Sequence, residues 1–175
     1  MRIVITGGPG FGKTSIIQGL KELDYPVVEE SSRDLINELK EKEGKDPRED
    51  RERFQNLIEQ KRIEDFNNNN QEIVFFDRGI HDEIANSLFE NKTPSKSCLD
   101  FCNENRYNQV FIVAPWEESR KHDLFRKESF EDAVKLNNLI IDAYKKTRHN
   151  IIIIPKLSIK ERVEFVINKI KKRNY

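Results

Sequence analysis

Short apolar runs rich in β-branched residues recur along the chain, and each is typical of a buried β-strand. They occupy residues 1–6, 73–76, 110–114 and 151–154, and a shorter one occupies 27–28. The runs are continuous and do not alternate with polar residues, which indicates strands covered on both faces, as in parallel sheets. Turn-forming residues, such as the glycines at 7, 8 and 10, follow the first run directly.

Between these runs, apolar residues recur every three or four positions, which is the spacing of one face of a helix. This pattern predicts helices over residues 13–23, 32–42, 82–91, 95–106, 130–146 and 158–172. A further long helix is predicted to open at Pro47 and to end at the asparagines 67–70. This helix is expected to be mostly solvent-facing, with four residues turned inward: Phe54, Leu57, Ile58 and Phe66.

Alternating strands and helices predict an α/β three-layer sandwich of about five parallel strands with right-handed crossovers. The length of 175 residues suits a single domain covering 1–175. The core is expected to be thin, because only 36% of the residues are hydrophobic.

Composition excludes several classes of partner. Lys and Arg number 31 and Asp and Glu number 31, so no overall charge attracts nucleic acid or acidic lipid, and neither partner is expected. The two cysteines, Cys98 and Cys102, are expected to be partly buried thiols. So few cysteines fit a protein of a reducing compartment. No apolar run is long enough to span a membrane. We therefore expect a cytoplasmic protein, and a homodimer is one open alternative for its oligomeric state.

The junction between the first strand and the first helix carries a phosphate-binding motif. Residues 7–14, Gly-Gly-Pro-Gly-Phe-Gly-Lys-Thr, match G-x-x-x-x-G-K-[ST] at every fixed position. The glycines let successive N–H groups converge on phosphate oxygens, and the following helix points its positive end there. We expect Lys13 to reach the β- and γ-phosphates and the Thr14 hydroxyl to ligate Mg²⁺.

This motif predicts ATP or another nucleoside triphosphate, with Mg²⁺, as cofactors. The predicted nucleotide-binding residues are Gly7, Gly8, Pro9, Gly10, Phe11, Gly12, Lys13, Thr14 and Ser15. Kinases, ATPases and GTPases share such a loop, so the motif predicts phosphate binding without specifying a reaction.

Charged residues at the ends of other strands are further candidates, because sites in parallel sheets lie beyond the carboxyl ends of strands. Asp77 follows a buried strand, where a carboxylate holds Mg²⁺ directly or through water, or else caps the next helix. Glu30 closes the second strand and would accept a proton from an acceptor hydroxyl, while Arg33 would clamp a phosphate or a carboxylate. A local ion pair at a helix start is the alternative for these two. The Arg78 side chain is expected either to project into the same site at the carboxyl ends of the strands or to lie in solvent.

A cationic segment at about residues 116–130 follows the fourth strand. In P-loop kinases such a segment is a lid whose arginines neutralise the phosphate in transit, which makes Arg120 and Arg126 candidate catalytic residues. The alternative is a solvated helical face with compensating acids. Because the two arginines are six positions apart, only a bent lid would bring both to one site.

Five motifs in order resemble the AAA-type predicted ATPase/kinase family of small P-loop proteins, which includes the ribosylnicotinamide kinase domain of bacterial NAD regulators. They are residues 7–14, 27–33, 75–82, 114–117 and 126–130, followed by 154–155 and a final helix. The resemblance implies a P-loop NTPase sandwich that is nucleoside/nucleotide-kinase-like, with strand order 2-3-1-4-5 and a mobile lid. It places Glu30 at the base position and Asp77 at the metal position. It further implies phosphate or acceptor contacts for Arg33, Arg78, Arg120 and Arg126.

Together these features favour an ATP-dependent kinase that phosphorylates a hydroxyl of a small, nucleoside-like metabolite. Its expected catalytic residues are Lys13, Glu30, Asp77, Arg120 and Arg126, and its expected substrate contacts are Glu30, Arg33 and Arg78. The alternative is a nucleotide-switched ATPase or GTPase that acts as a regulatory binding protein. The guanine motif Asn-Lys-x-Asp of Ras-like GTPases does not occur, because residues 91–94 and 168–171 both lack its Asp.

Trp116 follows the fourth strand and allows two interpretations. Its indole would stack on an aromatic ring of the acceptor or of adenine, or it would anchor the core at the end of the strand.

Overall fold

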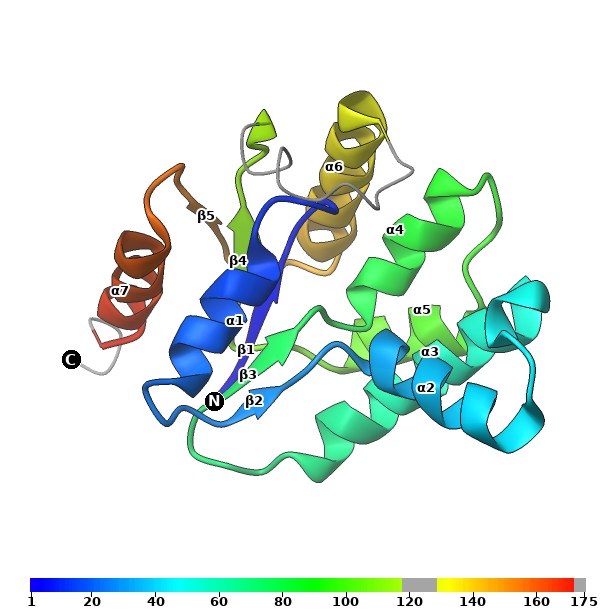
Figure 1. Cartoon of the computed structure of the whole chain (residues 1–175). Coiled ribbons are helices and arrows are strands. Elements are labelled where there is room, and N and C mark those ends of the chain that lie inside the picture. Colours follow the sequence, from blue (N-terminus) through cyan, green and yellow to red (C-terminus); the bar gives the residue numbers. More distant parts are fainter. Residues whose placement is uncertain (118–128, 172–175) are drawn as a thin grey trace.

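The computed structural model describes residues 1–117 and 129–171, without the side chains of Ser31, Arg33 and Asp34. Five parallel strands form one sheet in the order β2-β3-β1-β4-β5, which confirms the predicted fold class and strand order (Figure 1). The strands are β1 (Arg2–Thr6), β2 (Val27–Val28), β3 (Val74–Asp77), β4 (Gln109–Val113) and β5 (Ile151–Ile154).

Helices cover both faces of the sheet, as Figure 1 shows. They are α1 (Lys13–Lys21), α2 (Ser31–Glu43), α3 (Arg51–Asn68), α4 (His81–Phe89), α5 (Lys96–Glu104), α6 (Phe130–Lys146) and α7 (Ile159–Lys171). Ile3 and Ile5 of β1 pack with α1 and α7, whereas Val4 packs with the core under α3 to α6. All three side chains are fully buried, which is why these three consecutive positions of the strand are apolar.

The parallel connections bring the carboxyl ends of the strands to one edge of the sheet. The register pairs Ile5 of β1 with Asp77 of β3, so the segments that follow these strands leave the sheet side by side. Glycine-rich residues 7–12 follow β1, Glu30 follows β2 and Arg78 follows β3. Within the described parts of the chain, no helix combines the length and apolar character needed to cross a bilayer.

The start of α3 differs from the prediction. Pro47 opens a separate 3-10 turn, η1 (Pro47–Glu49), and not the long helix. The Asp46 side chain accepts a hydrogen bond from the Arg48 backbone N–H at the start of this turn. Asp50 then caps α3 by accepting from the backbone N–H of Arg53. Each aspartate starts its own segment, because a side-chain cap replaces the missing helical acceptor.

Four of the 18 residues of α3 are buried, and two of these four are charged, which the prediction of apolar inward residues did not include. Glu59 and Arg62 are each only 6% exposed, although both are charged. Glu59 accepts hydrogen bonds from the hydroxyls of Ser95 and Ser97 at the start of α5. Burial of these charges is possible because each has a partner on another helix.

Cys98 and Cys102 are more buried than predicted, with 1% of each residue exposed, and both are free thiols. They belong to the core between α5 and the sheet. At these positions the cysteines behave as small apolar core residues.

Two histidines lie beside the same core. The His81 ring stacks on Tyr144 with 4.7 Å between ring centroids and meets His149 edge-on at 4.6 Å. Burial and the neighbouring His149 lower the pKa of His81 to about 3. Burial likewise lowers the pKa of His149 to about 4. Nε2 of His149 accepts a hydrogen bond from the backbone N–H of Tyr107, which requires that nitrogen to be unprotonated.

We expect acid to destabilise the fold through these histidines. Their pKa values are below the ordinary 6.5, so below that pH the unfolded chain binds protons that the folded chain excludes. Stability is therefore complete above about pH 6.5 and falls by about 1.4 kcal/mol per pH unit for the fully buried His81. Urea unfolding between pH 8 and pH 5 measures this slope. His81→Phe should flatten it, and an equal slope in that variant would contradict the prediction.

Candidate functional site

The loop after β1 has the backbone shape that the motif predicts. Gly10 and Gly12 adopt left-handed conformations, with φ of 82° and 86°, which glycine accepts without strain. A Cβ at Gly8 would lie 2.4 Å from the backbone oxygen of Ala133 in α6, so only glycine fits there. Helix α1 begins at Lys13 with no side-chain cap and no acidic residue in its first turn. Its first N–H groups and positive end are therefore suited to an anion.

Lys13 lies inside this loop. Its side chain is 6% exposed, and Nζ donates a hydrogen bond to the backbone oxygen of Gly8 at 2.8 Å. Burial and the positive charge of Arg78 lower the pKa of Lys13 to about 7, against the opposing effect of Asp77. A polyphosphate near Nζ would favour the charged form again.

Helices α6 and α7 hold the loop in place through two contacts that no sequence pattern predicted. Oδ1 of Asn137, in α6, accepts a hydrogen bond from the Gly8 backbone N–H at 2.9 Å. Arg162, in α7, donates to the backbone oxygen of Phe11 at 3.3 Å. The guanidinium of Arg162 also lies 5.5 Å from the ring centroid of the half-buried Trp116. Both interpretations of Trp116 stay predictions.

Asp77 is the last residue of β3 and is 7% exposed. Its Oδ1 is buried and has no hydrogen-bond partner among residues 1–117 and 129–171. Burial raises the pKa of this carboxyl. Helix α4 has its N-cap at Ile80, so Asp77 is not the cap that the alternative interpretation supposed. A buried carboxylate oxygen without a partner fits a site for a cation or a cation-bound water.

A Mg²⁺ ion here would depend on phosphate oxygens as well as on protein. Thr14 is exposed in the first turn of α1, where its hydroxyl is accessible. In the described part of the chain, no group of three or more His, Cys, Asp or Glu residues is placed to hold a metal. Mg²⁺ commonly binds through one or two protein oxygens plus substrate phosphates, and Thr14 and Asp77 fit that pattern.

Glu30 and Arg78 come together from segments 48 residues apart. Nε of Arg78 donates to Oε1 of Glu30 at 3.0 Å, and the two side chains are 14% and 21% exposed. Burial alone would raise the pKa of Glu30, but the positive charges of Arg78, Arg62 and Lys13 lower it to about 2. Glu30 is therefore ionised at any ordinary pH. The alternative of a solvated Arg78 was wrong.

The predicted site residues thus fall into two groups. Those of the loop, together with Glu30, Asp77 and Arg78, lie at the carboxyl ends of β1, β2 and β3. The others are Arg33, whose side chain is outside the described structure, and Arg120 and Arg126, which lie outside the described residues.

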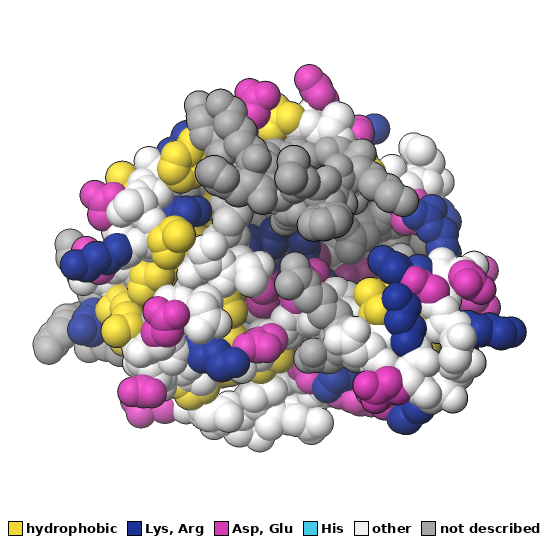
Figure 2. All heavy atoms as spheres, in the orientation of Figure 1, with side chains coloured by type: hydrophobic (Ala, Val, Ile, Leu, Met, Phe, Trp, Pro, Cys, Tyr) yellow, Lys and Arg dark blue, Asp and Glu magenta, His cyan; other side chains and the backbone are white. Residues whose placement is uncertain are grey.

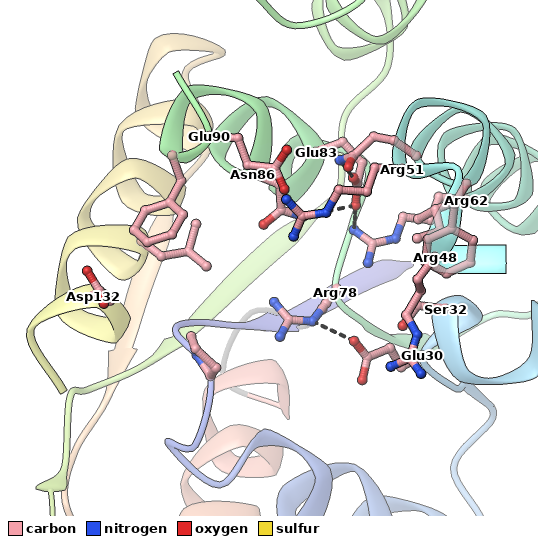
Figure 3. Close-up of a pocket in the computed structure, with 16 residues that line it drawn as sticks. Glu30, Ser32, Arg48, Arg51, Arg62, Arg78, Glu83, Asn86, Glu90 and Asp132 are labelled. Atoms are coloured by element: carbon pink, nitrogen blue, oxygen red, sulfur yellow. Dashed lines mark hydrogen bonds and ion pairs between the residues drawn. The ribbon is translucent and has the colours of Figure 1, made fainter. Parts of the chain in front are cut away.

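A pocket of about 590 Å³ opens beside the loop, and Figure 2 shows side chains of both charges around a recess on this face. Pro9 of the loop lines it together with Glu30 and Arg78, and Figure 3 shows Arg78 and Glu30 directed toward each other at its wall. The remaining lining comes largely from α3 and α4. It combines apolar Phe54, Ile58 and Phe89 with polar Gln55, Arg62, Glu83 and Asn86.

Glu83 organises the polar wall of this pocket. Its carboxylate pairs with Nη1 of Arg62 at 2.6 Å, and the side chains are only 3% and 6% exposed. Gln55 and Asn86 donate side-chain N–H bonds to the same carboxylate at 2.6 and 3.3 Å. These bonds fix the orientation of both amides. One feature of the sequence could have indicated this wall. Arg62 lies four residues after Ile58 and four before Phe66, which places it on the apolar face of the helix.

Comparisons with known proteins support the same fold. Deoxyadenosine kinase from M. mycoides with dCMP and dCDP bound has a TM-score of 0.68 and 20% identity, over 98% of this chain and 100% of that chain. The NadR protein in complex with NR has a TM-score of 0.67 and 17% identity, over 98% of this chain and 50% of that chain. Thymidylate kinase from Candida albicans has a TM-score of 0.64 and 16% identity, over 99% of this chain and 92% of that chain. At these identities the likeness establishes the fold.

No curated protein matches the chain in sequence. The model of one protein family, described as AAA domain, matches residues 2–162. This match includes the phosphate-binding loop, all five strands and the polar pocket wall. The chain therefore belongs to the AAA domain family.

Proposed function

We propose that this protein is an ATP- and Mg²⁺-dependent kinase that phosphorylates a hydroxyl of an uncharged, nucleoside-like metabolite. One observation carries the proposal: Pro9 of the phosphate-binding loop borders the same pocket as the Glu30–Arg78 pair. A donor held by the loop and an acceptor held in the pocket would meet at this border. Phosphoryl transfer depends mainly on such positioning and on electrostatic stabilisation.

Each group at the border has a role that its chemistry supports. Lys13 would bind the donor phosphates, and Thr14 and Asp77 would hold Mg²⁺, which neutralises phosphate charge when bound. The Glu30 carboxylate would accept a hydrogen bond from the acceptor hydroxyl and then its proton. A pKa of about 2 makes Glu30 a weak base in the empty site, which suits a loose transition state in which the proton leaves late. Arg33, Arg120 and Arg126 stay proposed phosphate contacts.

The charges of the pocket favour an uncharged acceptor. Its lining includes four arginines, Arg48, Arg51, Arg62 and Arg78, and four acids, Glu30, Glu83, Glu90 and Asp132. A nucleoside monophosphate would bring a dianion next to the carboxylate of Glu30, and the adjacent Arg78 is already paired with it. The negative charges of this phosphate and of Glu30 would repel each other, so a nucleoside is favoured over its monophosphate as the acceptor.

The walls of the pocket suit a flat heterocycle. Phe54, Ile58 and Phe89 supply apolar surface, and the amides of Gln55 and Asn86 supply hydrogen-bonding groups. The similar structures fit this chemistry, since one is a deoxyadenosine kinase with dCMP bound and another holds NR. A nucleotide-switched regulator needs no second pocket beside its phosphate-binding loop, so the kinase is the better explanation.

The test is a screen for a phosphorylated product. Purified protein is incubated with Mg-ATP and single nucleosides or their 5′-monophosphates, and products are read by mass spectrometry. We expect at least one nucleoside to gain a phosphate, and its 5′-monophosphate to react far more slowly. Slow ATP hydrolysis with no phosphorylated product in any sample would refute the kinase and favour the switch.

A further inference from the structure

Asp82, in the first turn of α4, is fully buried and contacts four groups from three parts of the fold. Its Oδ1 accepts a hydrogen bond from the hydroxyl of Thr6 and lies 3.5 Å from Nη1 of Arg78. Its Oδ2 accepts from the Gly79 backbone N–H at 3.0 Å and from the Tyr144 hydroxyl at 2.8 Å. Both carboxylate oxygens are thus occupied, which is what a buried charge requires.

These contacts surround a backbone conformation that needs support. Arg78 has a φ of 72°, in the left-handed region that side chains other than those of Gly, Asn and Asp rarely adopt. The Arg78 backbone N–H donates to the backbone oxygen of Ile5 at 3.1 Å. The Gly79 bond to Asp82 fixes the next peptide group. The bond from the Arg78 N–H to Ile5 and the bond from the Gly79 N–H to Asp82 thus hold the turn in place.

A simple helix-capping role does not explain this arrangement. A cap would account for the bond from Gly79 alone, and capping carboxylates usually lie at the surface. Here Thr6 immediately precedes the phosphate-binding loop, and Tyr144 belongs to α6, the helix that also holds Gly8. Asp82 thus joins the turn that carries Arg78 to the end of β1 and to α6.

We propose that Asp82 is a positioning residue that holds the Arg78 turn, so that the Arg78 guanidinium meets Glu30 at the pocket wall (Figure 3). Without the Asp82 charge, the guanidinium would lose one of its two described carboxylate contacts, and the strained turn would lose an anchor. The placement of Arg78 is independent of what the protein catalyses. The effect of a displaced Arg78 on turnover of the acceptor, by contrast, rests on the proposed function.

Arginine side-chain NMR tests the placement directly. In ¹⁵N-labelled protein, the Arg78 Nε–H signal, assigned with Arg78→Lys, should exchange slowly because it donates to Glu30 in a nearly buried pair. Asp82→Asn should accelerate that exchange about tenfold or more, the effect of losing one charge-assisted hydrogen bond. Asp142→Asn, at an exposed site on α6, is the matched control and should change nothing. Unchanged Arg78 exchange in folded Asp82→Asn would overturn the inference.

Kinetics test the consequence for the acceptor. Asp82→Asn should lower kcat/KM for the acceptor roughly 10- to 150-fold while the Kd for Mg-ATP stays the same. An equal loss of donor affinity would indicate general damage and would overturn the positioning role. If the wild-type protein phosphorylates no acceptor, the proposed function fails, and the NMR result still decides the role of Asp82.

A milder variant keeps the test decisive if Asp82→Asn does not fold. Tyr144→Phe removes one hydrogen bond to Oδ2 and leaves the Asp82 charge in place. We expect Arg78 exchange to accelerate a few-fold, within the range for one neutral hydrogen bond. No acceleration in Tyr144→Phe would overturn the inference.

Discussion

Glu30→Gln is expected to lower kcat by about two to four orders of magnitude, the range for losing a general base. The amide keeps the size of the carboxylate, and its oxygen can still accept the hydrogen bond from Nε of Arg78, but it cannot take the proton of the acceptor hydroxyl and carries no charge to form an ion pair. Mg-ATP should bind as tightly as before, because the phosphate-binding loop does not use Glu30. Steady-state kinetics and calorimetric titration of Mg-ATP measure the two effects separately.

Glu29→Gln is the matched control for this variant. Glu29 precedes Glu30 in the chain, but it is exposed and pairs with Lys21 on α1. Its replacement should leave kcat within about twofold, since exposed ion pairs contribute little. Equal turnover by Glu30→Gln and the wild type would remove Glu30 from the role of base. Because the pKa of Glu30 is about 2, its protonation should not limit activity at any pH above about 4.

Lys13→Ala is expected to abolish the rise in melting temperature that Mg-ATP produces in the wild-type protein. The loss of charge-assisted bonds from Nζ to phosphate should weaken binding by about 1.5–3 kcal/mol, or roughly 10- to 150-fold. Stabilisation by a ligand depends on its concentration relative to Kd, so such a loss removes the shift at moderate concentrations. Thermal melts with and without Mg-ATP provide the measurement.

The melting temperature of the empty variant separates this effect from misfolding. Lys13 is buried with a lowered pKa, so its removal takes an unfavourable charge out of the empty protein. We therefore expect the empty variant to melt close to the wild type. Lys21→Ala, at the exposed end of α1, should retain the full shift. A full shift with Lys13→Ala would contradict the proposed donor site.

The main elements of the fold could be predicted from the sequence because they depend on local patterns. The continuous apolar runs became β1 to β5, and the range 130–146 became α6 at the same boundaries. The start of α3 was harder to predict, because Asp46 and Asp50 each cap a separate turn. Neither aspartate is clearly favoured over the other as the start of the long helix. The burial of Glu59 and Arg62 in α3 was missed because their partners lie on other helices.

The phosphate-binding loop could be predicted because its glycines, Lys13 and Thr14 are contiguous and their backbone shape follows from residue type. The ends of the strands could also be placed at one edge of the sheet, which brought Glu30, Asp77 and Arg78 to a common region. The sequence left open whether Arg78 faced solvent or the site. The pair with Glu30 answers that question, since it needs the registers of β1 to β3.

By itself, the sequence determined the order of strands and helices and the loop that begins α1. Only the tertiary structure decided which distant polar groups meet: Arg78 with Glu30, Arg62 with Glu83, and Asp82 with Thr6 and Tyr144. The physical reason is that burying a charged or polar group costs free energy unless a partner compensates it. That partner is chosen by how the helices pack across the sheet, and no local pattern in the chain records the choice.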